Sequence, residues 1–242
     1  MTRWKASGIH FSLSLLIGLI AFCLLYFVYF PQPYFQAAGA GQLVLILLGV
    51  DVILGPLLTL VVFKSGKKTL KFDLATIAVL QFAALSYGLH VMWVARPVFI
   101  VAAIDRVELV YANALDDSDL AKAVGRFAKR SLSGPVFVGV TLPTDTKEVL
   151  ELRDSALAGK DIQLFPRYYR SWDISVTQDL LKRAIPPSRL PEKAQGALKL
   201  YQANHAGQEL AAIPLRGRVG EYTLVLDAKT GKHLTALNAA PW

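Results

Sequence analysis

The chain has 242 residues, of which 54% are hydrophobic, and a formal net charge of +8. The charge is uneven, because residues 1–96 carry seven Lys/Arg and two Asp/Glu, whereas residues 97–242 carry nineteen and sixteen. The positive excess therefore accompanies long apolar runs, and the remainder is too nearly balanced to form a basic groove, which argues against a nucleic-acid partner. The single cysteine, Cys23, excludes an intrachain disulfide and a thiol pair for metal or redox chemistry.

The first apolar run covers residues 9–30 and follows Arg3 and Lys5. A cleaved signal peptide is the alternative, since residues 38–40 (Ala-Gly-Ala) resemble a cleavage site. The run is longer than the 7–15 apolar residues of a signal peptide, and two prolines separate it from the alanines. The sequence therefore predicts an uncleaved transmembrane helix.

Two further apolar runs, residues 43–63 and 74–94, are also long enough to cross a bilayer, which takes about 20 helical residues. The connection at residues 31–41 has no charge, whereas basic residues flank the other ends of the spans. The expected topology determinants are Arg3, Lys5, Lys64, Lys67, Lys68 and Lys71. Because cytoplasmic flanks carry the excess of Lys and Arg, we expect a cytoplasmic N-terminus and a periplasmic C-terminal domain in a bacterial inner membrane.

Two domains are therefore predicted: a three-helix transmembrane domain over residues 1–96 and a periplasmic α+β domain with an antiparallel sheet over residues 97–242. In the second domain, the pattern predicts one or two strands at 98–112, a helix at 116–130, a strand at 136–142, helices at 145–158, 178–184 and 192–204, and a closing meander at 209–215, 220–226 and 232–237. Residues 161–175 are expected to be irregular.

Asp51 lies near the middle of the second apolar run, where a carboxylate costs about 3 kcal/mol to insert. Gly55 and Thr59 follow at i+4 and i+8, so the three residues share one helix face. Two interpretations are open. In the first, Asp51 bonds Gln81 of the third span; in the second, Asp51, Gly55, Thr59 and Gln81 form a face that docks the transmembrane helix of a partner. Pro56 is expected to loosen the helix just beyond Asp51.

An enzymatic role has little support in the sequence. An intramembrane aspartyl dyad of Asp51 and Asp73 would need the two carboxylates nearly in contact, but Asp73 lies at the end of its span. The four histidines have no metal-ligand spacing, and there is no phosphate loop or nucleophile elbow. We therefore expect no catalytic residue, no metal and no cofactor. The aromatic and arginine-bearing stretch at 165–172 is interpreted as a loop that packs inward, with a binding surface as the alternative.

The chain resembles the type IV pilin accessory proteins of the TfpX/TfpZ kind. The resemblance rests on residues 3–6 (RWKA), 8–10 (GIH), 49–51 (GVD), 54–60 (LGPLLTL), 63–68 (FKSGKK), 72–74 (FDL), 80–81 (LQ), 87–88 (YG), 96–99 (RPVF), 105–106 (DR), 112–113 (AN) and 241–242 (PW). It covers the whole chain but is dense only over residues 1–113. No single motif has a chemical role that transfers to this chain.

The resemblance implies a non-enzymatic inner-membrane accessory factor that assists assembly or stability of a cognate type IV major pilin. The implied partners are the membrane, the pilin helix and head, and other pilus assembly proteins. One alternative is an envelope sensor or transporter-associated subunit with a ligand-binding periplasmic domain. Another is an intramembrane protease that uses Asp51 and Asp73.

Overall fold

The computed structural model describes residues 1–205 and 207–242, and the chain forms two compact units. The first unit contains residues Met1–Tyr29 and Ala40–Val94, and the second contains Phe30–Gly39 and Ala95–Trp242. The connection between the first two predicted spans therefore belongs to the second unit.

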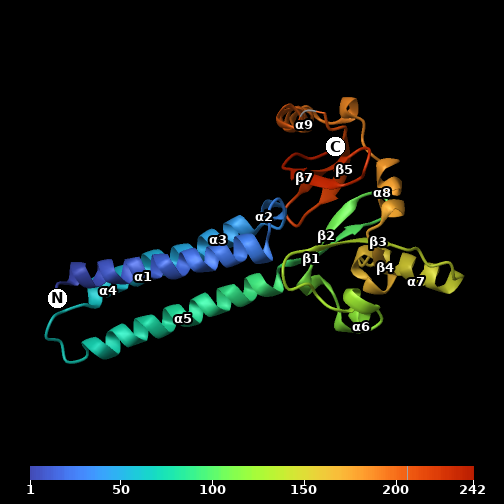
Figure 1. Ribbon diagram of the computed structural model, residues 1–242. Coiled ribbons are helices and arrows are strands. Elements are labelled where there is room, and N and C mark those ends of the chain that lie inside the picture. The colour runs from blue at the N-terminus through green and yellow to red at the C-terminus, as the bar shows by residue number, and fades with distance from the viewer. Residues whose placement is uncertain (206) are drawn as a thin grey trace. The chain divides into compact units, whose positions relative to one another are not determined.

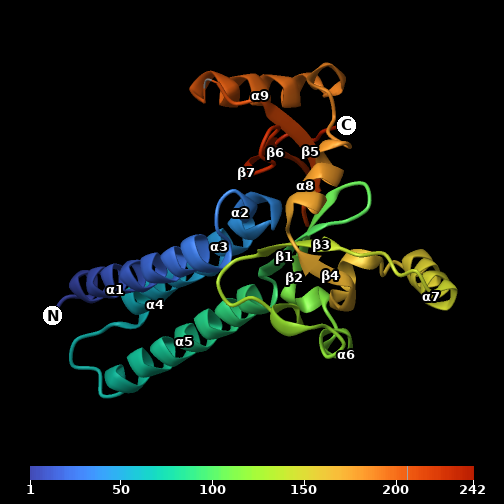
Figure 2. The same cartoon turned by 45° about the vertical axis from the view of Figure 1, so that its right-hand side comes forward.

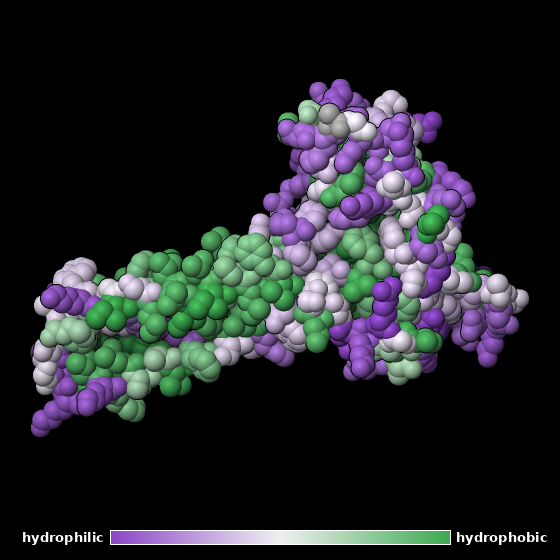
Figure 3. Space-filling view, in the orientation of Figure 1, coloured by the Kyte–Doolittle hydropathy of each residue, from purple (hydrophilic) through white to green (hydrophobic). Residues whose placement is uncertain are grey.

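Within the described residues, the first unit has three helices long and apolar enough to cross a membrane: Arg3–Tyr29, Ala40–Val62 and Leu70–Val94. They comprise α1 (Arg3–Cys23) with a π-helical end (Leu24–Tyr29), α3 (Ala40–Gly49) joined to α4 (Gly55–Val62) by a π-helical segment (Val50–Leu54), and α5 (Leu70–Val94). The prediction of three apolar helices is confirmed. Figure 1 shows the three helices running alongside one another, and the face of them seen in Figure 3 is mostly hydrophobic, with hydrophilic residues at the end that holds the N-terminus.

The π-helical segment Val50–Leu54 has a local cause. Pro56 occupies the start of α4, and proline has no amide hydrogen to donate to the preceding turn. A wider turn accommodates this missing bond, and such turns are frequent at functional positions. Asp51 lies inside the segment, so its main-chain carbonyl is available to a side chain from another helix.

The second unit is built on a sheet that has seven strands in the described part of the chain, in the order β4-β3-β1-β2-β5-β6-β7. Their bounds are β1 Pro97–Ala102, β2 Val107–Tyr111, β3 Val136–Val140, β4 Tyr169–Ser171, β5 Leu210–Arg216, β6 Glu221–Asp227 and β7 His233–Leu237. The predicted antiparallel sheet is wrong in part, since β1 pairs with β3, and β2 with β5, in parallel. Long connections make this arrangement possible, because parallel neighbours require the chain to cross back between them.

The sheet has two halves, each with its own hydrophobic core. They meet through a short parallel pairing, Val107 with Leu215 and Glu108 with Arg216. The core of the first half packs β1, β2 and β3 against α6 (Asp117–Leu120). In the second half, α9 (Glu192–Asn204) covers the closing meander of β5, β6 and β7, whose antiparallel pairing agrees with the prediction.

The helix predicted at residues 116–130 is wrong beyond its first turn. Gly125 has a φ of +59°, in the left-handed region, so a right-handed helix cannot continue through it. After α6 the chain forms a short 3-10 turn, Gly125–Ala128. The Arg130 side chain then reaches back to the Ala112 carbonyl at 2.8 Å and the Asp117 carboxylate at 2.6 Å.

The remaining helices follow the predictions more closely. Helix α7 (Thr146–Leu157) begins at Asp145, whose carboxylate accepts the Glu148 amide at 3.1 Å. No residue of α7 is buried, and Figure 2 shows this helix standing away from the sheet. Helix α8 (Ile174–Leu181) begins four residues earlier than predicted, because Asp173 caps it by accepting the Val176 amide at 3.0 Å.

Candidate functional site

The four residues of the candidate docking face lie together inside the first unit. Asp51 and Thr59 are 7% and 2% exposed, and Gly55 is also buried. The Gln81 amide of α5 donates to the Asp51 main-chain carbonyl at 3.0 Å. A β-carbon added at Gly55 would lie 2.1 Å from the Gln81 amide nitrogen, so only glycine leaves room for this side chain. The helices therefore approach closely at Gly55 and are joined there by Gln81.

Helix α1 supplies polar partners to the same face. The His10 ring nitrogen Nδ1 lies 2.6 Å from the Thr59 hydroxyl, and the Ser7 hydroxyl donates to the Pro56 carbonyl at 2.9 Å. The Pro56 carbonyl and the Thr59 hydroxyl therefore already have hydrogen-bond partners inside the first unit. No spacing along the chain connects His10 with Thr59, because which residues of different helices meet depends on how the helices pack.

The contacts made by Thr59 and Gly55 favour the internal interpretation of this face. Docking of a partner helix directly on Asp51, Gly55, Thr59 and Gln81 stays a prediction. The hydrogen bonding of this cluster is incomplete, because the buried Asp51 Oδ1 and Gln81 Oε1 atoms have no hydrogen-bond partner among the described residues.

The predicted topology determinants lie on exposed positions at the ends of the helices. Arg3 and Lys5 begin α1, and Lys64 and Lys68 lie in the connection between α4 and α5, where Gly66 has a φ of +83°. Their role in orientation stays a prediction.

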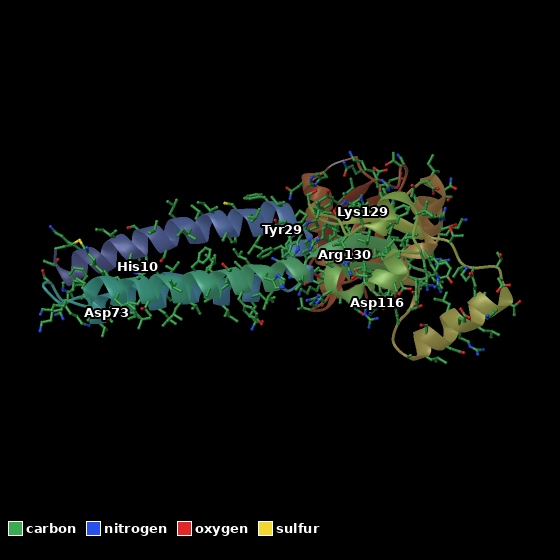
Figure 4. All side chains as sticks on the ribbon, turned by 90° about the horizontal axis from the view of Figure 1, so that it is seen from below. His10, Tyr29, Asp73, Asp116, Lys129 and Arg130 are labelled. Carbon is green, nitrogen blue, oxygen red and sulfur yellow. The ribbon has the colours of Figure 1, made fainter. Side chains whose placement is uncertain are left out.

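Asp73, near the start of α5, binds Lys67 across the same connection, with 2.7 Å between Oδ2 and Nζ. His10 and Asp73 lie toward one end of the first unit and Tyr29 toward the other (Figure 4). Asp73 thus has a local ion-pair partner, whereas Asp51 lies in the π-helical segment halfway along its span.

In the second unit, residues 30–39 form a packed element around the short helix α2 (Tyr34–Ala37). The Ala37 carbonyl accepts the Arg218 amide at 2.8 Å and lies 3.4 Å from the Tyr111 hydroxyl. Gly217 permits this approach, because a β-carbon there would lie 2.4 Å from the Ala37 oxygen. The connection between the first two apolar helices is therefore part of the folded second unit.

Tyr34 joins this element to the edge strand β7. Its hydroxyl lies 2.9 Å from His233 Nε2, and the two rings stack with centroids 5.9 Å apart. Burial lowers the pKa of His233 to about 4, so the ring is neutral near pH 7. Phe137 packs against both rings, with its centroid 4.9 Å from His233 and 6.4 Å from Tyr34. The sequence analysis counted His233 only as a histidine without ligand spacing.

A pocket of about 370 Å³ lies where the parallel strands β1 and β3 end. Ligands of open sheets commonly bind beyond the carboxyl ends of parallel strands. Arg170 is held at the rim, with Nε donating to the Val140 carbonyl at 3.2 Å, and Arg183 and Asp179 of the α8 region also line it. Its walls mix these charged groups with apolar side chains from both strands and α8. The arrangement can accept a small ligand that has an anionic and an apolar part.

The aromatic and arginine-bearing stretch at 165–172 packs mostly inward, as the favoured interpretation predicts. Phe165 and Tyr168 are buried in a small core with Ile162, and the Arg167 guanidinium lies over both rings at 5.0 and 4.8 Å. Tyr169 belongs to β4, which the sequence analysis did not predict. Trp172 is half-buried against Phe137.

The described residues contain no group of three or more His, Cys, Asp or Glu side chains arranged to hold a metal. The expectations of no metal, no cofactor and no catalytic residue stay predictions.

Together, the two units define a class of protein: a helical part with three helices of membrane-crossing length, joined to a mixed-sheet domain that incorporates the first connection between those helices. The family model for the fimbrial assembly protein FimB matches residues 1–39. A fimbrial assembly protein of serogroups C1 and C2 from Dichelobacter nodosus is 35% identical over 108 residues, which cover 44% of this chain and 82% of that protein. The chain belongs to the fimbrial assembly protein (FimB) family.

Two longer relatives from Dichelobacter nodosus extend the similarity along the chain. The fimbrial assembly protein of serogroup I is 29% identical over 232 residues, and that of serogroup E1 is 28% identical over 233 residues. Each alignment covers 92% of this chain and 90% of the relative. No solved structure matches the chain.

Proposed function

We propose that this protein is a non-enzymatic accessory factor of the bacterial inner membrane that assists assembly or stability of a type IV major fimbrial subunit. The observation that carries the proposal is the similarity along nearly the whole chain to proteins named for fimbrial assembly. The finer resemblance to the TfpX/TfpZ kind belongs to this proposal. In it, the partners are the membrane, the fimbrial subunit and other fimbrial assembly proteins.

The distribution of charge supports an orientation for this role. Positive residues flank α1 and fill the α4–α5 connection, while residues 31–41 carry none. By the positive-inside rule, the N-terminus lies in the cytoplasm and the second unit in the periplasm. A fimbrial subunit with one helix in the same membrane and a head outside it could then meet both units of this protein. Two linked weak contacts bind more tightly than either alone, because the second forms at a high effective concentration.

A clean in-frame deletion tests the proposal. We expect surface fimbriae to be lost or strongly reduced, counted by electron microscopy and by immunoblot of sheared fimbriae, and restored by the native gene in trans. Normal fimbriae in the deletion strain would overturn the function. The amount of fimbrial subunit in the membrane separates two roles: a fall indicates stabilisation of the subunit, and an unchanged pool indicates assistance in polymerisation.

The second candidate is an envelope sensor or transporter-associated subunit, which the pocket at the ends of β1 and β3 favours. Arg183 lines that pocket and is exposed, so Arg183→Ala removes a binding group without opening the core. This candidate predicts that R183A impairs ligand uptake or signalling while fimbriae stay normal. The fimbrial proposal predicts that deletion removes fimbriae, with no uptake or signalling defect.

A further inference from the structure

An apolar groove of about 270 Å³ runs between α3 and α5 in the first unit. Its walls come from residues 43–51 on one side and 84–92 on the other, and Asp51 is the one carboxylate in its lining. Eight residues of helix extend about 12 Å. The groove therefore covers about two turns of each helix. It extends from Asp51 toward the start of α3 and the end of α5.

Asp51 makes this groove different from an ordinary gap between membrane helices. It is 93% buried, and its Oδ1 atom has no hydrogen-bond partner among the described residues. The neighbouring Gln81 Oε1 atom is likewise buried and without a partner in the described part of the chain. A buried polar atom without a hydrogen bond destabilises a protein, because it has lost its bonds to water without replacement. Both unpaired atoms are acceptors, so the missing component is a hydrogen-bond donor.

We propose that this groove binds one transmembrane helix of a partner protein, and that the bound helix brings a donor group to Asp51. The inference rests on the proposed function, in which that partner is the fimbrial subunit. The helix would be apolar where it lies along α3 and α5, with a hydroxyl, amide or amine group at the depth of Asp51. Ala84 is a small residue in the groove lining and allows the backbone of a bound helix to approach closely, whereas the Leu47 side chain of α3 fills the space at Gly88.

Two other occupants fit the groove less well. A lipid acyl chain matches the apolar walls but has no donor for a carboxylate in the hydrocarbon region. A second copy of this chain, docked across a two-fold axis, would place one Asp51 groove against another and add a second set of acceptors. The Ser7 hydroxyl and the His10 ring of α1 cannot serve a second copy in this way, because they already bond Pro56 and Thr59.

The experiment uses the full-length chain in cells that also express the fimbrial subunit. A photoreactive benzoylphenylalanine replaces Tyr87, which lines the groove and is 71% exposed. The matched control places it at Phe82, which is 73% exposed on the same helix but does not line the groove. We expect an adduct with the fimbrial subunit from position 87 at about ten times the yield from position 82, because only position 87 faces the groove.

A second pair of variants tests whether the groove itself is the site. Ala84→Trp fills the groove, whereas Ala83→Trp adds the same side chain at an exposed position about 100° around the helix and outside the groove. We expect A84W to reduce the position-87 adduct about tenfold and A83W to leave it unchanged. Asp51→Leu gives a second, independent test: it removes the buried Oδ1 acceptor that the partner helix is proposed to bind, so the adduct should fall while an immunoblot shows that the protein still accumulates.

Several results would overturn the inference. These are equal adducts from positions 82 and 87, a position-87 adduct that A84W and D51L leave intact, or an adduct only with lipid or a second copy of this chain. The proposed function is judged separately by the deletion. If deletion removes fimbriae and the A84W variant restores them fully, the function stands and the groove is not the docking site. If deletion leaves fimbriae normal, the function itself fails.

Discussion

His233 is a single residue whose protonation should affect the stability of the second unit. Burial lowers its pKa from 6.5 to about 4, so between these values the unfolded chain binds more protons than the folded chain. Stability from the neutral ring is therefore complete above pH 6.5 and is lost as the pH falls toward 4. Because the ring is partly exposed, we expect a loss of about 1 kcal/mol between pH 7 and pH 5.

The measurement is the urea midpoint of the full-length chain in detergent, followed by tryptophan fluorescence at pH 7 and pH 5. Other carboxylates, such as those of Asp173 and Asp227, have pKa values lowered by their hydrogen bonds and also cost stability as the pH falls. The difference between the wild type and His233→Gln isolates the histidine, because glutamine retains an acceptor for Tyr34 but does not titrate. Equal pH dependence in both proteins would show that His233 stays solvated.

Thr59 supports a second prediction at the scale of one residue. Its hydroxyl is buried and lies 2.6 Å from His10 Nδ1, so Thr59→Val removes one partner while keeping the shape of the side chain. Hydrogen bonds between helices in membranes contribute about 0.6 kcal/mol, so the fall in stability should be about this size. It is measured as the shift in thermal unfolding in detergent, with Thr59→Ser as the control that keeps the hydroxyl. An equal fall in both variants would mean that packing, and not the hydrogen bond, is responsible.

At the scale of elements, the packing of segment 30–39 against Gly217 and Arg218 leads to a prediction about stability. Gly217→Ala would place a β-carbon 2.4 Å from the Ala37 main-chain oxygen, and neither backbone can move without losing the Arg218–Ala37 bond. We expect a cost of about 1–3 kcal/mol and faster proteolysis within residues 30–39. Gly196→Ala on α9 is the matched control, since nothing lies within 4 Å of a β-carbon there. That substitution should stabilise the helix by up to about 1 kcal/mol.

Elements whose signals are local could be predicted from the sequence, and those that depend on distant residues could not. Apolar length predicts the three helices, the apolar spacing before residue 204 predicts α9, and the Asp227 turn predicts the hairpin of β6 and β7. The parallel pairing of β1 with β3 depends on a connection of more than thirty residues, which has no local signature. The positive φ of Gly125, which is incompatible with a helix continuing to residue 130, likewise does not follow from its neighbours.

The candidate site divides in the same way. The sequence places Asp51, Gly55 and Thr59 on one helix face, because they are four residues apart. It predicts a bond between Asp51 and Gln81 only because the two residues lie at a similar depth in their membrane spans. It does not connect His10 to Thr59 or Tyr34 to His233, since these partners are 49 and 199 residues apart. Contacts of that kind follow from packing, which the order of residues along the chain does not express directly.

At the scale of the whole molecule, the chain passes between the two units three times, at Phe30, at Gly39 and at Ala95. Two of these passages bound the segment that holds Tyr34 and Ala37 in the second unit. This connectivity suits a protein proposed to engage a fimbrial subunit both within the membrane and outside it.

The orientation of the whole molecule provides the last prediction. If the positive flanks direct insertion, replacing Arg3, Lys5, Lys64, Lys67, Lys68 and Lys71 with Gln removes the asymmetry, because residues 31–41 carry no charge to oppose it. A mixed orientation should result, read from alkaline phosphatase and green fluorescent protein fused after Trp242: the wild type gives phosphatase activity alone, and the variant gives both signals. The matched control replaces six exposed lysines of the second unit, Lys122, Lys129, Lys147, Lys182, Lys193 and Lys199. It lowers the net charge equally but leaves the helix flanks intact, so orientation should not change. Fluorescence from the wild-type fusion would place the second unit in the cytoplasm and remove its access to a fimbrial head outside the membrane.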